Sequence, residues 1–229
     1  MVSNEFIPGV VTHSELNPLL WQGNSLRREV KQALMQIARR FYQFLAVDAK
    51  VIDVIVTGSQ AGKTYTDQSD LDLHLIMNYA EIACDDQTPA ELLDTKRKLW
   101  KLEHSIHIHT VPVECYAEDL NRPVQGASYS LIKNSWIKES ATPQGQPADV
   151  TVTTTAWCRV ITAALRTRDL EQMQRVRSLL KTYRQLGLDL EGELGRANIT
   201  FKTLRNMGVI ASLIQSIQHQ QDQELSLPD

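Results

Sequence analysis

The sequence predicts an α+β domain over residues 1–142, followed by an α-helical domain over residues 148–229. In the first part, short apolar segments rich in β-branched residues alternate with amphipathic helical patterns, whereas the second part carries helical periodicity alone. Between them lies ATPQGQP at residues 141–147, whose two prolines and one glycine make it the best linker candidate. A chain of 229 residues is long enough for two such domains.

The first domain is expected to contain two helices and several short strands. Apolar residues recur every three or four positions over residues 26–45 and predict a helix, and Pro89 favours a second helix over residues 90–104. Residues 1–24 are interrupted by two prolines and two glycines and are expected to form an irregular arm on this domain. Strands are predicted at residues 51–56, 71–77, 106–111 and 112–116, with a further hairpin at residues 129–138.

Helical periodicity fills the second domain. Gly187 is expected to end one helix and Gly208 another, because glycine is favoured directly after the last helical residue. The helices are predicted at residues 156–165, 169–186, 198–207 and 209–221.

The composition is that of an ordinary soluble globular protein with a net charge of −3, so the chain as a whole is not a polycation. Three scattered cysteines without a Cys-x-x-Cys pair predict free thiols in a reducing compartment. The first residues, MVSNEFIPGVV, predict no signal peptide, and no apolar run reaches the roughly 18–20 residues of a membrane span. We therefore expect a cytoplasmic protein without disulfides or a membrane partner.

Two carboxylates alternate with leucines where the strand at residues 71–77 begins. Asp70 and Asp72 in SDLDL would lie on one face of that strand. Two like charges in a buried place are unfavourable unless a cation lies between them, and a divalent metal ion is the common solution. Gly58 and Ser59 end the preceding strand and form a turn that suits phosphate. The stretch therefore predicts a Mg²⁺ site facing a phosphate-binding turn.

The same stretch contains Gly-Lys-Thr at residues 62–64, which is the end of a P-loop pattern. That pattern requires glycine at position 57, where Thr57 stands, and a long helix directly afterwards, where a polar loop follows. The spacing therefore argues against a P-loop. Lys63 is still a candidate phosphate ligand in another geometry.

A third carboxylate, Glu114, stands between Val113 and Cys115 in a predicted strand, and such a position calls for a functional reason. Together, Gly58-Ser59, Asp70-x-Asp72 and Glu114 resemble the fingerprint of the DNA polymerase β-like nucleotidyltransferase superfamily, over about residues 50–120. The Gly-Ser and Ser-Asp-Leu-Asp motifs are most similar to those of its minimal bacterial and antibiotic-modifying members. The segments LNPLLW, YSL and NITFKTLRNMG resemble nucleotidyltransferases encoded by bacteriophages.

This resemblance implies a mixed sheet flanked by helices and an enzyme that moves a nucleoside monophosphate from an NTP to a hydroxyl group, releasing pyrophosphate. It implies two Mg²⁺ ions held by Asp70, Asp72 and Glu114. Glu114 would also accept the proton of the attacking hydroxyl. Gly58 and Ser59 would hold the β- and γ-phosphates.

Lys181 and Arg184 lie three residues apart on a predicted helix and are candidates for binding the triphosphate or an acceptor, since the resemblance implies a helical part that closes over the nucleotide. Ten lysines and arginines against five acids between Arg159 and Arg205 slightly favour an RNA 3′ end as the acceptor. A protein side chain and a small molecule stay open as acceptors. The alternatives to an enzyme are a non-catalytic nucleotide-binding protein and a phage structural or interaction protein that kept the fold.

Overall fold

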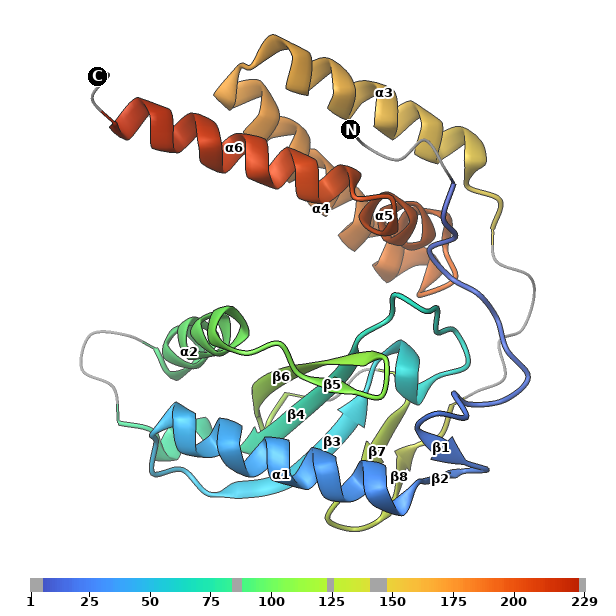
Figure 1. Cartoon of the computed structure of the whole chain (residues 1–229), viewed down its shortest axis with the longest axis vertical. Coiled ribbons are helices and arrows are strands. Elements are labelled where there is room, and N and C mark those ends of the chain that lie inside the picture. Colours follow the sequence, from blue (N-terminus) through green and yellow to red (C-terminus); the bar gives the residue numbers. More distant parts are fainter. Residues whose placement is uncertain (1–5, 84–87, 123–125, 141–147, 227–229) are drawn as a thin grey trace. The chain divides into compact units, whose positions relative to one another are not determined.

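A computed structural model describes residues 6–83, 88–122, 126–140 and 148–226 (Figure 1). Contacts divide the chain into two compact units, which we call the sheet unit (Thr12–Gln144) and the helical unit (Met1–Val11 with Gly145–Asp229). The contacts thus group the beginning of the N-terminal arm with the helices, whereas the sequence assigns the whole arm to the first domain. The predicted linker at residues 141–147 lies outside the described residues.

The sheet unit is a mixed α+β structure built on a six-stranded sheet with the strand order β5-β6-β4-β3-β7-β8. Strands β4 and β6 are parallel, while β3 is antiparallel to both β4 and β7. The strands are β3 (Val51–Thr57), β4 (Leu71–Met77), β5 (His107–Ile108), β6 (Val111–Asp119), β7 (Ser128–Ser130) and β8 (Ser135–Lys138). The other elements are the hairpin β1 (Trp21–Gln22) and β2 (Ser25–Leu26), helices α1 (Arg28–Leu45) and α2 (Pro89–Glu103), and the short 3₁₀ helices η1 (Ser59–Ala61) and η2 (Tyr79–Glu81).

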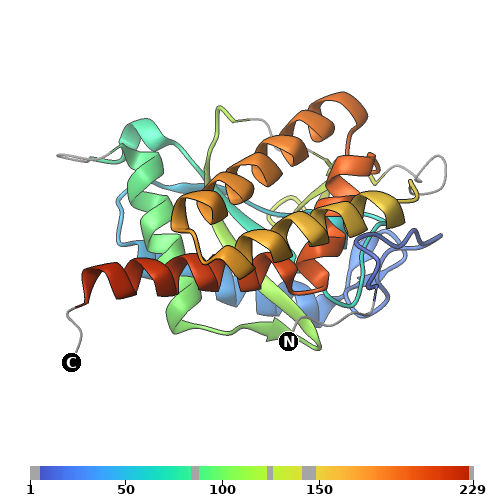
Figure 2. The ribbon, with the colours of Figure 1, turned by 90° about the horizontal axis from the view of Figure 1, so that it is seen from above.

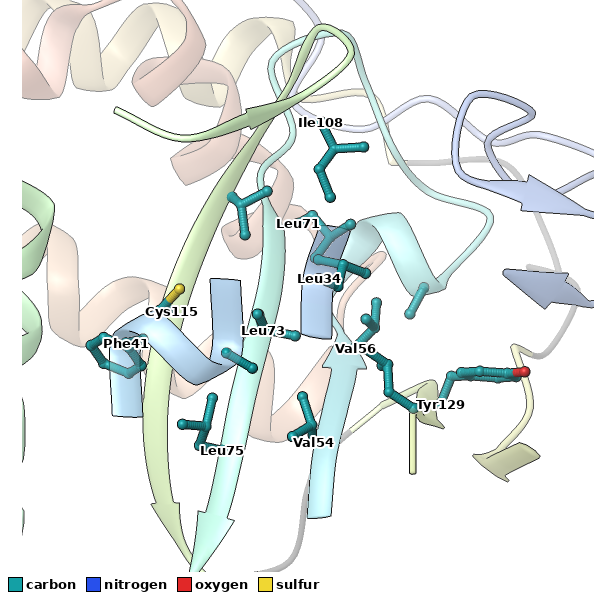
Figure 3. Close-up of a cluster of buried hydrophobic side chains, with 14 of the residues drawn as sticks. Leu34, Phe41, Val54, Val56, Leu71, Leu73, Leu75, Ile108, Cys115 and Tyr129 are labelled. Atoms are coloured by element: carbon teal, nitrogen blue, oxygen red, sulfur yellow. The ribbon is translucent and has the colours of Figure 1, made fainter. Parts of the chain in front are cut away.

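One face of the sheet forms the core of this unit. Leu71, Leu73 and Leu75 alternate along β4 and are completely buried, and Leu34 and Phe41 of α1 belong to the same cluster (Figure 3). Burying such side chains stabilises the unit by about 1.5–3 kcal/mol each. Because side chains alternate along a strand, the residues between these leucines lie on the opposite face, and this face carries the candidate site.

The predicted strands at residues 106–111 and 112–116 have different bounds in the structure. A turn at His109, whose φ of 53° is left-handed, separates the short strand β5 from β6. Strand β6 then continues to Asp119, because it pairs with β4 along its length as far as Met77. The sequence ended this strand too early because the hydrogen bonds that extend it come from a distant segment.

The four helices of the helical unit pack on one another around a core of their own (Figure 2). Residues 6–11 belong to this unit because the Gly9 N–H donates to Thr203 Oγ1 at 3.0 Å and Asn206 Nδ2 donates to the Pro8 carbonyl at 2.9 Å. The helices are α3 (Thr151–Thr167), α4 (Leu170–Glu191), α5 (Arg196–Asn206) and α6 (Val209–Leu225).

Gly187 does not end a helix, contrary to the sequence-based expectation. Helix α4 runs through it and ends at Gly192, whose φ is 72°. A Cβ atom on Gly187 would lie 2.2 Å from the Cβ of Ala197. The glycine therefore allows α4 and α5 to approach closely. Gly208, in contrast, does separate α5 from α6, with a φ of 74°.

Candidate active site

Strand β4 places its carboxylates on the face of the sheet opposite the core. Leu71 and Leu73 are buried against α1, whereas Asp72 between them is half-buried on the other side. Asp70, directly before the strand, is half-buried too. The strict alternation of leucine and polar residues produces this arrangement, since one face of β4 has to enter the core. The predicted strand at residues 71–77 is thus confirmed.

Strand β6 places Glu114 beside Asp72. The two residues are direct partners in the parallel register of β4 and β6, and adjacent strands lie about 4.8 Å apart. Glu114 alternates with the buried Val113 and Cys115, so its side chain lies on the same face of the sheet as that of Asp72. Two carboxylates 42 positions apart in the sequence are therefore neighbours in the fold.

Gly58 completes this arrangement from the other side of β4. Its φ of 77° and ψ of −163° are favourable only for glycine, and a Cβ atom here would lie 2.1 Å from Asp72 Oδ2. The Asp72 carboxylate thus lies directly against the backbone of Gly58. Ser59 follows as the first residue of η1 and is half-buried. The glycine–serine turn and the β4 carboxylate form one local constellation.

The Glu114 carboxylate has two hydrogen-bond donors. Lys101 of α2 donates to Oε1, and the Tyr116 hydroxyl donates to Oε2 at 2.7 Å. Burial by itself would raise the pKa of Glu114, but the hydrogen bonds from Lys101 and Tyr116 outweigh it and hold the pKa below its usual value. Glu114 is therefore ionised at neutral pH, which suits a cation ligand better than a proton acceptor.

Tyr116 and His74 extend the polar face away from Glu114. Their rings stack with centroids 4.6 Å apart, and the Arg97 guanidinium lies 5.2 Å from the Tyr116 centroid. Burial and the nearby Asp72 charge raise the pKa of Tyr116. Burial, with a smaller contribution from the Arg122 charge, lowers the pKa of His74 to about 4, so His74 is neutral at pH 7. His74 follows Asp72 by two positions on β4 and therefore lies on the same face of the sheet.

A buried polar network holds the loop between β3 and β4. The side chain of Gln60, which is 1% exposed, accepts a hydrogen bond from Asn17 Nδ2 at 2.9 Å and donates to the Ser69 carbonyl at 2.9 Å. Trp21 Nε1 donates to the Gln60 carbonyl at 2.8 Å. The N-terminal LNPLLW segment is thereby hydrogen-bonded to Gln60, which connects the two ends of the loop between the glycine–serine turn and Asp70.

The structure places the remaining candidates as follows. Lys63 lies half-buried in the loop before β4, and its carbonyl accepts a hydrogen bond from the His13 N–H. Arg184 belongs to the helical unit, where it donates to Asn198 Oδ1 at 3.2 Å and lies 4.5 Å from the centroid of the Phe201 ring. Lys181 is exposed on the same helix. The nucleotide-binding role of these three residues stays a prediction.

The donor chemistry of this face fits Mg²⁺, since carboxylate oxygens are its preferred protein ligands. Asp72 and Glu114 are register partners, and Asp70 precedes Asp72 by two positions. Within residues 6–83, 88–122, 126–140 and 148–226, no group of three or more His, Cys, Asp or Glu side chains is arranged to hold a metal ion. A cation bound by Glu114 would compete with Lys101, which donates to Oε1 of the same carboxylate.

Sequence reasoning missed Lys101, Tyr116 and Gln60. Tyr116 follows Glu114 by two positions, so strand alternation was a signal that would have placed it on the same face. No comparable signal exists for Lys101, which reaches Glu114 from another element, or for the buried Gln60. These contacts depend on how distant segments of the chain pack.

The chain matches no known family model, no curated protein and no solved structure. In the part of the chain that the structure describes, no helix is long and apolar enough to cross a membrane. Cys115 and Cys158 are free thiols, in agreement with the expectation for these two residues. The third cysteine, Cys84, lies outside the described residues.

Proposed function

We propose that this chain is a nucleotidyltransferase of the DNA polymerase β-like superfamily. It would transfer a nucleoside monophosphate from an NTP to a hydroxyl acceptor in a Mg²⁺-dependent reaction and release pyrophosphate. One observation carries the proposal: the Asp72 carboxylate lies directly against Gly58 and is the register partner of Glu114. The three parts of the sequence fingerprint thus meet on one face of the sheet.

In this proposal each residue type has a chemical role. The acceptor hydroxyl oxygen attacks the α-phosphorus of the NTP, the bond from that phosphorus to the bridging oxygen of the β-phosphate breaks, and pyrophosphate leaves. Mg²⁺ ions held by Asp70, Asp72 and Glu114 would stabilise the charge on the phosphoryl oxygens. Gly58 permits backbone to approach a phosphate closely, because it has no Cβ atom.

The low pKa of Glu114 limits its ability to accept the proton of the attacking hydroxyl group. A carboxylate held ionised by Lys101 and Tyr116 is a weak base, so Glu114 acts here first as a ligand. The hydroxyl proton then passes to solvent or to Glu114 after Lys101 has moved away. The acceptor itself is an RNA 3′ end, a protein side chain or a small molecule.

The test is incubation of the protein with each α-³²P-labelled NTP and Mg²⁺, together with separate pools of RNA, protein and small hydroxyl compounds. The double variant D70N/D72N should lose at least about a thousandfold in transfer, because several kcal/mol of charge stabilisation disappear. Asp67→Asn is the matched control, since Asp67 is an exposed acid of the same loop. Full activity in D70N/D72N, or neither product nor NTP binding in the wild type, would refute the proposal.

A second candidate is a non-catalytic nucleotide-binding protein. The pairing of Glu114 with Lys101 and Tyr116 favours it, because those contacts already satisfy the third carboxylate without a metal ion. Equilibrium dialysis with labelled NTP distinguishes the two candidates. NTP binding without transfer to any acceptor pool would support the second.

A further inference from the structure

A pocket of about 200 Å³ lies beside Glu114, between the C-terminal half of α2 and strands β5 and β6. Arg97 and Lys101 line it from α2 at a spacing of four, so they share one face of the helix, and His104 lines it from the position directly after α2. His107 lines it from β5. Four residues with basic side chains thus surround one pocket.

The lining holds two cationic side chains, Arg97 and Lys101, and two imidazoles. Glu114 is the one carboxylate among its described lining residues. Asp94, which lies outside the lining, fixes Arg97 at 2.7 Å. A phosphate group offers three strong acceptor oxygens and up to two negative charges, so it can accept hydrogen bonds from several of these donors at once. The lining therefore fits a phosphate group best.

Lys101 belongs to this pocket and to the candidate active site at the same time. Its ammonium group pairs with Glu114 although the lysine side chain is 62% exposed and the glutamate side chain only 20%. When a cation neutralises Glu114, the lysine loses this partner and is repelled by the cation. The ammonium group can then pair with an anion in the pocket that Lys101 already lines.

We propose that the pocket between α2, β5 and β6 binds a phosphate group of the acceptor, and that Lys101 passes from Glu114 to this phosphate when Glu114 binds a cation. The assignment to the acceptor rests on the proposed function, whereas the anion site itself does not. Cation binding and phosphate binding then strengthen each other, because each ligand breaks the Lys101–Glu114 ion pair and leaves one partner available for the other ligand. The acceptor is accordingly a phosphate-bearing compound.

The experiment separates the anion site from metal binding. Inorganic phosphate is titrated into ¹⁵N-labelled protein in EDTA, and binding is followed by the amide shifts of residues 97–107. Glu114→Gln releases Lys101 without any metal ion and should bind phosphate about two- to fivefold more tightly than the wild type, the range expected for one exposed ion pair. Adding Lys101→Met to Glu114→Gln should abolish this gain.

Lys98→Met is the matched control. Lys98 is on the same helix, its side chain is 65% exposed, and it pairs with Asp94 instead of lining the pocket. The gain should therefore survive in the Glu114→Gln background when Lys98 is replaced. If Glu114→Gln does not fold, Lys101→Met in the wild-type background should still weaken phosphate binding, while Lys98→Met should not.

The outcomes are distinguishable. Absence of phosphate shifts at residues 97–107 in every variant, or a gain that survives Lys101→Met, overturns the inference and leaves nucleotide transfer unaffected. Phosphate binding that follows Lys101 in a protein without transferase activity retains the anion site and refutes the proposed function. Methyl phosphate and dimethyl phosphate, tested in parallel, show whether the site prefers a monoester or the diester of a nucleic-acid strand.

Discussion

Replacing Gly58 with alanine tests the central contact of the candidate site. Gly58 (φ 77°, ψ −163°) and Gly192 (φ 72°, ψ −161°) share one glycine-only conformation, so alanine costs each about 1–3 kcal/mol in backbone strain. A Cβ atom at Gly192 meets nothing within 4 Å, whereas at Gly58 it lies 2.1 Å from Asp72 Oδ2. Pushing Asp72 off its rotamer adds about 1 kcal/mol at Gly58 alone. G58A should therefore be the more destabilising variant by this amount.

The assay is urea unfolding followed by tryptophan fluorescence and circular dichroism, with the transition of each unit fitted separately. In a double-mutant cycle, Asp72→Ala should remove the extra cost of G58A, because the obstructing carboxylate is then absent. Equal destabilisation by G58A and G192A, or a cycle without coupling, would show that Asp72 does not lie against Gly58. That result would also remove the observation on which the proposed function depends.

Three further predictions concern the structural support. Gln60→Ala should destabilise the sheet unit by about 2–4 kcal/mol in urea, since buried partners lose their hydrogen bonds, whereas exposed Gln68→Ala should change stability by less than about 0.5 kcal/mol. Gly187→Ala should destabilise the helical unit by about 1–3 kcal/mol through its collision with Ala197, and Ala197→Gly should restore the loss; lack of rescue would contradict this packing. Burial raises the pKa of Cys115 to about 12. With the other cysteines replaced by serine, the Cys115 thiol of the folded protein should therefore react with DTNB at pH 8 at least about a thousandfold more slowly than that of the urea-unfolded protein. Comparable rates in the two states would refute this burial.

Strand and helix positions in this chain follow largely from local pattern. The leucines of β4 and the apolar stripe of α1 predict their elements because one face of each has to be buried, whatever the rest of the fold. The predicted ends of two elements were wrong, because contacts with a distant segment determine where these elements end. Strand β6 extends to Asp119 by pairing with β4, and α4 passes through Gly187, whose missing Cβ atom gives Ala197 of α5 room to pack.

The sequence by itself determined which residues are chemically suited to the candidate site and which face of β4 they occupy. The alternation of leucine with Asp70 and Asp72 decides this, because the period of a strand is a local property. Only the tertiary structure decided that Asp72 lies against Gly58 and that Lys101 reaches Glu114. Those contacts join segments whose separation is set by strand order and helix packing, and no local pattern specifies either.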